Sequence, residues 1–274
     1  MLFKLKLIII SLLVAAGLGI FTWQADYYFY VLEFLIGLHL LLVWPFIKRL
    51  RFVAMPFFLS SGALNLLYLV DGETKRILFI VLATIVYYLA LLGAYRLRHY
   101  DCDLTAQGMI NLATIVTVFF WFVSNYGWYL NFDIDSWVLV VVFIVSTFLI
   151  TFPSLAICFV SCYKIRYRRR KWGRYITRQE LISALTEQIK VERIALFFSS
   201  ILALIMGEII WGLSQWPFGY LVTGTASVLF FFLFWIIIRR FIQGRLTRKF
   251  VVVNISLVFI LVILMLVTSP WTLR

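Results

Sequence analysis

The sequence is poor in charge. Only 14% of its 274 residues are Asp, Glu, Lys or Arg, whereas a soluble domain usually carries about 25%. So few charges cannot cover a water-facing surface of this size. Hydrophobic residues make up 64% of the chain and occur in long runs, not in the alternating or one-faced patterns of soluble folds. Lipid is therefore the expected solvent for most of the surface.

Cysteine and histidine are also scarce. The three cysteines, Cys102, Cys158 and Cys162, are too few and too scattered for a disulfide framework. Two thiols four residues apart, without a nearby His or Asp, make a poor metal site. His39 stands alone in its hydrophobic run, and His99 lies in a polar loop without recognised ligand spacing. We expect no metal and no cofactor.

Motifs that carry known chemistry are missing as well. The chain has no Gly-rich phosphate loop, no nucleophile elbow and no zinc-type histidine pair on a helix. The loops expected outside the membrane are too short to build an active site there. An enzyme with an aqueous catalytic domain is therefore not expected.

What the sequence does contain is a series of long hydrophobic runs. At 1.5 Å per residue, each is long enough for a helix that crosses a hydrocarbon core of roughly 30 Å. The runs predict an all-α fold, a single polytopic bundle over residues 1–274 with about nine spans. The predicted spans are Leu5–Trp23, Tyr27–Phe46, Phe52–Val70, Ile77–Tyr95, Met109–Leu130, Trp137–Tyr163, Ile194–Leu213, Phe218–Ile238 and Phe250–Thr268.

The loops predict the orientation. With nine spans and a cytoplasmic N-terminus, 22 of the 25 Lys and Arg residues fall on the cytoplasmic side. The outer side then holds only Lys75, Arg76 and Arg274. This is the distribution that the positive-inside rule favours, and it places the C-terminus outside. We expect a multi-pass protein of the cytoplasmic membrane if the source is bacterial.

The first run follows Lys4 and Lys6 and resembles a signal peptide in that respect. We expect it to be retained, because the run is long and Trp23 stands where a small residue should precede a cut after Ala25. Cleavage would leave eight spans with unchanged orientation.

One sizeable polar segment, residues 164–193, is expected on the cytoplasmic side. Thr177 and Glu180 form a capping box. It predicts a short amphipathic helix that lies on the inner surface or leads straight into the seventh span. A basic cluster opens the segment, and we expect it to contact anionic lipid head groups. Its members include Arg166, Arg168, Arg169, Arg170, Lys171 and Arg174.

Two acids, Glu33 and Glu208, lie inside predicted spans. An ionisable group there is costly and marks a candidate functional site. By helix rise, both lie roughly 9 Å in from the outer end of their spans, and Asn65 and Asn125 fall in the same outer third. The four side chains could form one polar pocket for a proton, a cation or a lipid head group. Alternatively, the carboxyls are protonated and merely hold helices together.

Small residues recur every fourth position in the seventh predicted span. Side chains of this size let another helix backbone approach closely. The stripe predicts helix packing, and it makes this span the candidate central helix. Its members are Ala195, Ser199, Ala203 and Gly207.

Two stretches carry a family resemblance: RILFIVLATIVYYLALLG over 76–93, and GEIIWGLSQWPFGYLVTGTASVLFFF over 207–232. In the second, an acid in a span is followed by a proline turn and another aromatic-rich span. This is similar to a family of multi-span bacterial membrane proteins of unknown function. The resemblance implies no activity and no catalytic residues.

Three functions remain open from the sequence. The first is a non-catalytic membrane component, such as a subunit, scaffold or assembly partner of a larger complex. The second is a carrier or lipid-handling protein with its site at Glu33 and Glu208. The third is an intramembrane enzyme acting on lipid-linked substrates. The expected partners are membrane lipids, anionic on the cytoplasmic face, and other membrane proteins, but no nucleic acid.

Overall fold

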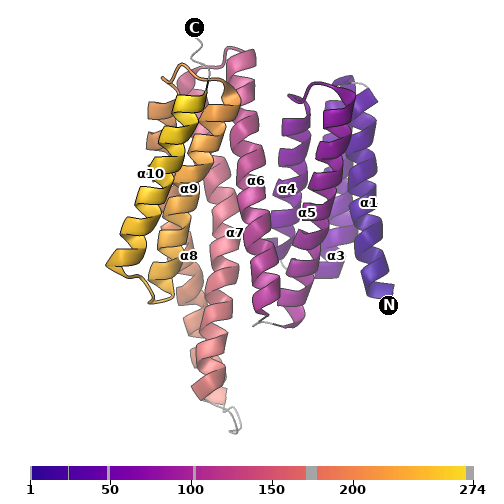
Figure 1. Ribbon diagram of the computed structural model, residues 1–274. Helices are drawn as coiled ribbons and strands as arrows, with labels where there is room; N and C mark the ends of the chain where they lie inside the picture. The colour runs from indigo at the N-terminus through magenta and orange to yellow at the C-terminus, as the bar shows by residue number, and fades with distance from the viewer. Residues whose placement is uncertain (1, 24, 48–49, 101–102, 171–177, 270–274) are drawn as a thin grey trace.

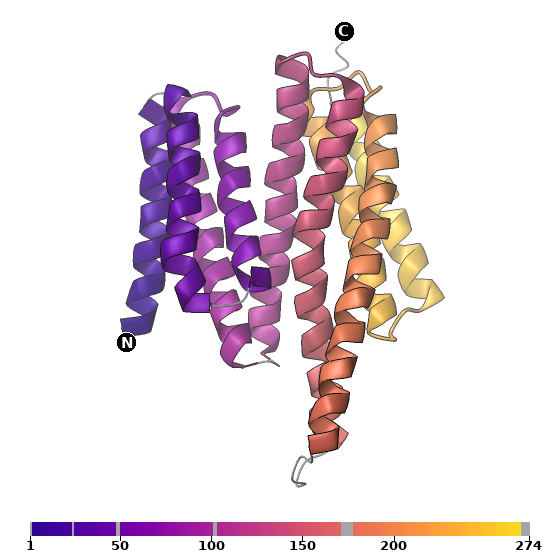
Figure 2. The same cartoon turned by 180° about the vertical axis from the view of Figure 1, so that it is seen from behind.

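The computed structural model describes residues 2–23, 25–47, 50–100, 103–170 and 178–269. These residues are almost entirely helical and contain no strand, which confirms the all-α class for the described part of the chain. The helices stand side by side in one upright bundle (Figures 1 and 2). Their bounds are α1 Leu2–Trp23, η1 Ala25–Tyr27, α2 Tyr28–Leu38, η2 His39–Val43, α3 Trp44–Ile47, α4 Leu50–Leu67, α5 Glu73–His99, α6 Leu104–Asn131, α7 Ser136–Arg170, α8 Arg178–Leu213, α9 Tyr220–Ile242 and α10 Arg248–Thr268.

Seven of these helices are long and apolar enough to cross a membrane. They lie in α1 and in α5 to α10. Two shorter apolar stretches, Tyr28–Val43 and Phe52–Leu67, complete the set of hydrophobic runs expected from the sequence. By helix length and composition, the chain is therefore a multi-pass membrane protein.

The second hydrophobic run is not one regular helix. It passes from α2 into the π-helix η2 and then into α3. The physical reason lies in Pro45, which has no N–H to continue the α-helical ladder and whose ring crowds the carbonyl four residues before it. The Trp44 N–H instead bonds to the His39 carbonyl, five residues back, which is the π-helical pattern.

The central helix is α6, not the seventh span that the small-residue stripe indicated. Helix α6 packs against α4, α5, α7 and α9, whereas α8 packs mainly against α7 and α9. Small and hydroxylated side chains explain this, because Ala113, Thr117, Ser124 and Gly127 allow neighbours on several sides of α6. The small-residue stripe of α8 lies on one side of that helix only.

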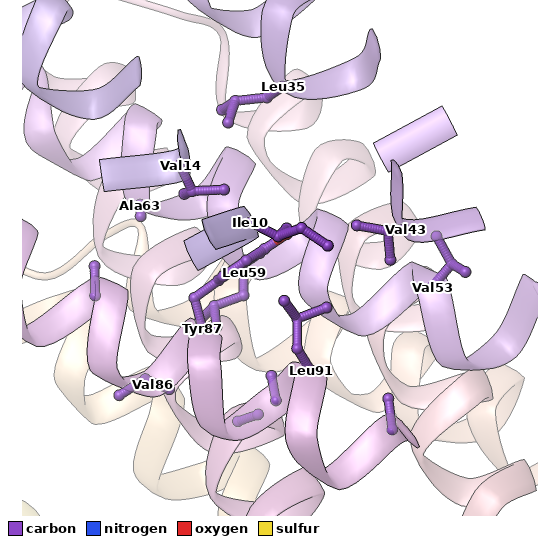
Figure 3. Close-up of a cluster of buried hydrophobic side chains, with 14 of the residues drawn as sticks. Ile10, Val14, Leu35, Val43, Val53, Leu59, Ala63, Val86, Tyr87 and Leu91 are labelled. Atoms are coloured by element: carbon purple, nitrogen blue, oxygen red, sulfur yellow. The ribbon is translucent and has the colours of Figure 1, made fainter. Parts of the chain in front are cut away.

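Three buried clusters hold the bundle together. The first joins α1, α2, α4 and α5, and Figure 3 shows part of it, with Ile10, Leu59 and Leu91 in the region of Tyr87. The second joins α6 to α9 and contains Phe122. The third fastens α10 to α9 and is much smaller. Helix α6 contributes to the first two clusters, so it connects the two halves of the bundle.

Helices α7 and α8 form a long hairpin that extends past the ends of the neighbouring helices (Figures 1 and 2). They contain 35 and 36 residues, or about 52 to 54 Å by helix rise, more than a hydrocarbon core needs. Residues 178–193 belong to α8, which runs without a break into the seventh predicted span. Residues 171–177 lie outside the described part.

Candidate functional site

The two acids of the predicted spans lie on the surface of the bundle. Glu33 of α2 and Glu208 of α8 are both exposed. Helices α2 and α8 do not pack against each other in the described structure. Neither acid is among the residues that line the pocket containing Asn65 and Asn125. The structure therefore separates the four expected residues into one pair of asparagines and two single carboxyls.

The two asparagines meet near the end of the bundle where α6 turns into α7. They line a pocket of about 210 Å³, which we call the asparagine pocket, together with Tyr28, Trp128, Ile134, Val138, Leu139 and Val142. The Tyr28 hydroxyl donates a hydrogen bond to Asn65 Oδ1. The Asn125 Nδ2 is buried and has no hydrogen-bond acceptor among the described residues. A buried amide donor of this kind calls for an acceptor in the pocket.

A larger cavity lies further along the same helices. Its volume is about 800 Å³, within the range of cavities that hold small-molecule ligands. We call it the apolar cavity. Its lining residues are apolar except His39 and Glu192, the latter being the one charged residue among them. They are Ile36, His39, Leu40, Trp44, Val53, Ala54, Phe57, Phe58, Leu149, Phe152, Pro153, Ala156 and Glu192.

The rim of the apolar cavity faces away from the protein core. Leu40 and Leu149 line it and are 60% and 41% exposed. Because these side chains sit on the outer surface of a bundle whose solvent is lipid, the cavity opens sideways toward the membrane. An apolar molecule could enter without crossing water.

His39 is a polar group on the wall of the apolar cavity. It is 2% exposed, and its Nδ1 donates to the Leu35 carbonyl at 2.7 Å. Its Nε2 lies 3.0 Å from the Tyr87 hydroxyl. The Leu35 carbonyl can only accept, so Nδ1 carries a proton, while Nε2 shares a hydrogen bond with the Tyr87 hydroxyl. Both nitrogens are therefore occupied, and the ring is a fixed part of the wall.

Sequence reasoning set His39 aside because one histidine makes no metal site. A useful signal was present in Pro45, which disturbs the helix that carries His39. π-Helical segments occur often at functional sites. The described residues contain no group of three or more His, Cys, Asp or Glu side chains that could hold a metal ion.

The small-residue stripe of α8 is buried along its whole length. Ala195, Ser199, Ala203 and Gly207 are all enclosed by neighbouring side chains. A Cβ on Gly207 would lie 2.6 Å from Ile144 Cγ1 of α7, so that position holds the two helices at close range.

The side chains of the basic cluster lie outside the described residues. Arg166, Arg168, Arg169 and Arg170 belong to the last turns of α7, while positions 171 and 174 fall in the undescribed segment. Their expected contact with anionic lipid stays a prediction.

No family model, no curated protein and no solved structure matches this chain. The resemblance of residues 76–93 and 207–232 to a bacterial membrane family therefore adds nothing to the assignment of fold or function.

Proposed function

We propose that this chain is a lipid-handling protein that holds an acyl chain in the apolar cavity between η2, α4 and α7. One observation carries the proposal: a cavity of about 800 Å³, lined almost wholly by apolar side chains, opens sideways from a multi-pass bundle. An acyl chain bound there would fill the cavity and contact its aromatic and aliphatic side chains. The site replaces the pair of acids that the sequence indicated for this role.

We further propose that the protein crosses the cytoplasmic membrane nine times with its N-terminus inside. The two shorter apolar stretches supply the eighth and ninth spans, since α2, η2 and α3 together cover Tyr28–Ile47. The excess of Lys and Arg in alternate loops supports this orientation. The end of the hairpin formed by α7 and α8 then lies on the cytoplasmic side.

The lipid-handling proposal is tested by filling the apolar cavity. Ala54 lines it and is half-buried, so Ala54→Phe adds a ring to the wall. Native mass spectrometry of the full chain, purified in mild detergent and mixed with dioleoylphosphatidylglycerol, measures the acyl lipid that stays bound. We expect the variant to retain several-fold less lipid than the parent.

Val145→Phe is the matched control. Val145 is 50% exposed on α7 and does not line the cavity. It adds the same ring to a lipid-facing surface, and lipid retention should stay at the parent level. Equal retention by the parent and both variants would overturn the proposal.

We also keep the membrane-component function, because one helix is attached weakly. Among the described residues, helix α10 packs mainly on α9, and Val258 and Val262 are its buried residues. Lipid supplies no hydrophobic drive for helix association, so packing area decides it. A helix of a partner protein that packs on α10 would add to the small contact that α10 makes with α9. Copurification of a stoichiometric partner that is lost when residues 248–268 are replaced by an unrelated apolar helix would support this function, whereas unchanged copurification would refute it.

A further inference from the structure

The asparagine pocket and the apolar cavity lie on one seam of the bundle. The seam follows the contact of α4 with α7, residues of α2 and η2 lie beside it, and residues of α4 and α7 line both spaces. Seven residues separate Asn65 from Phe58 on α4, and seven separate Val142 from Leu149 on α7. Both intervals correspond to about 10 Å of helix rise. Helices α4 and α7 therefore give the same separation, along the helix axes, between the asparagine pocket and the apolar cavity.

Phe58 is the residue of the apolar cavity that lies nearest to Asn65 along α4. The Trp121 Nε1 of α6 donates to the Phe58 carbonyl at 2.8 Å, and the two rings lie edge to face. Phe58 itself lines the apolar cavity. A ligand that occupies both spaces has to cover the interval of about 10 Å between them, which an extended acyl chain does.

The asparagine pocket differs chemically from the apolar cavity. The Tyr28 hydroxyl and Asn65 satisfy each other, while the buried Asn125 Nδ2 has no acceptor within the described protein. No charged residue of the described structure lines the pocket. A phosphate brought there would meet no cation, which makes an anionic head group costly. A carbonyl, ester or hydroxyl oxygen, in contrast, would accept from Nδ2 at no such cost.

We propose that the seam binds one amphiphile with a small neutral head group, whose oxygen accepts a hydrogen bond from Asn125 and whose acyl chain runs toward the apolar cavity. This rests on the proposed lipid-handling function. At about 210 Å³ the asparagine pocket is smaller than a drug-sized site. The head group is therefore limited to a few atoms, such as the glycerol ester of a diacylglycerol.

The test is a competition between lipids that share their tails. The full chain in mild detergent is mixed with equal amounts of dioleoylglycerol and dioleoylphosphatidylglycerol, and native mass spectrometry gives the ratio retained. The parent should prefer dioleoylglycerol by about tenfold, because the phosphate of the other lipid would lie beside the asparagine pocket without a cation. Asn125→Leu should lower the amount of dioleoylglycerol retained and so reduce the ratio, because the ester or hydroxyl oxygen loses its amide donor. Asn111→Leu makes the same change on α6 away from the pocket and should keep the parent ratio.

A third lipid, a monohexosyl dioleoylglycerol, separates two sources of the same oxygen chemistry. Its hexose is neutral and offers oxygen acceptors but exceeds the few atoms that a pocket of about 210 Å³ admits, so the parent should retain less of it than of dioleoylglycerol. Equal or better retention of the hexosyl lipid would overturn the size limit on the head group. If the parent retains all three lipids equally, the head-group proposal is overturned. If Ala54→Phe still lowers that retention, the lipid-handling function stands. Loss of the Ala54→Phe effect overturns both.

Discussion

Tyr87 of α5 forms a hydrogen bond with His39 of η2, with 3.0 Å between the phenolic oxygen and Nε2. Both side chains are buried, and the imidazole is held on its other side by the Leu35 carbonyl. The ring meets Phe57 edge to face, with 5.5 Å between the ring centres. The bond therefore ties the irregular part of the second hydrophobic run to the neighbouring helix and fixes one wall of the apolar cavity.

Removing that hydroxyl should cost stability. In Tyr87→Phe the Nε2 of His39 loses its hydroxyl partner inside the bundle, and we expect the unfolding free energy to fall by about 1–2 kcal/mol. Unfolding by a denaturing detergent, followed by circular dichroism, measures this. Tyr88→Phe is the control, since Tyr88 is the half-buried neighbour on the same helix and is not the partner of His39. Equal losses in the two variants would contradict the role given to the bond.

Hydrophobic length and composition were enough to predict the helices. Eight of the nine predicted spans fall on one α-helix each, and the second divides among η1, α2, η2 and α3. A run of about twenty apolar residues in lipid forms helix because it has to satisfy its backbone internally. The predicted ends were less accurate for α7 and α8, which continue beyond the hydrophobic run into the polar segment. There the sequence retains helical propensity after its apolar pattern has ended.

The site could be predicted only in part. Depth along each span placed Asn65 and Asn125 in the same outer third, and both side chains line one pocket of the structure. Depth says nothing about which side of a helix faces a neighbour, and for this reason Glu33 and Glu208 were grouped with them although both are exposed. The apolar cavity was missed because its walls consist of ordinary apolar residues from distant parts of the chain.

The contact between α6 and α9 provides a test of packing. A Cβ on Gly224 would lie 2.8 Å from the Val123 Cα, which is backbone and cannot rotate away. We expect Gly224→Ala to lower the unfolding free energy by about 1–3 kcal/mol through overpacking. Gly212→Ala is the matched control, since a Cβ added at that position of α8 would have no neighbour within 4 Å among the described residues. It should stabilise the protein by about 0.5–1 kcal/mol through helix propensity. The reverse order of the two effects would refute this account.

The start of α6 depends on one carboxylate. Asp103 accepts hydrogen bonds from the backbone N–H groups of Thr105 and Ala106 and pairs with Arg96 at 2.6 Å. Asp103→Ala removes the cap and the pair, and should cost about 1 kcal/mol. Asp103→Asn keeps a capping oxygen and loses only a half-exposed ion pair, so its cost should be a few tenths of a kcal/mol. Similar losses in the two variants, measured by the same unfolding assay, would show that the ion pair and not the cap stabilises this helix end.

The proposed topology is tested by cysteine labelling. In a background with the three native cysteines replaced by serine, single cysteines are placed at Glu73 and Asp135 for the outer side, and at Arg51 and Arg245 for the inner side. A membrane-impermeant maleimide applied to intact cells should label the first two positions. The other two should react only after the membrane is permeabilised, because nine spans place them in the cytoplasm.

Arg51 is the decisive position of the four. If α2, η2 and α3 cross the membrane and α4 returns, position 51 lies on the cytoplasmic side. If these shorter helices instead form a re-entrant pair, position 51 ends inside the bilayer and stays unlabelled from both sides, while Glu73 still reacts from outside. Their lengths alone leave both arrangements physically open, since Tyr28–Val43 and Phe52–Leu67 are each shorter than a usual span. Labelling of position 51 after permeabilisation would therefore establish nine spans. Absence of labelling at position 51 from both sides would reduce the count to seven.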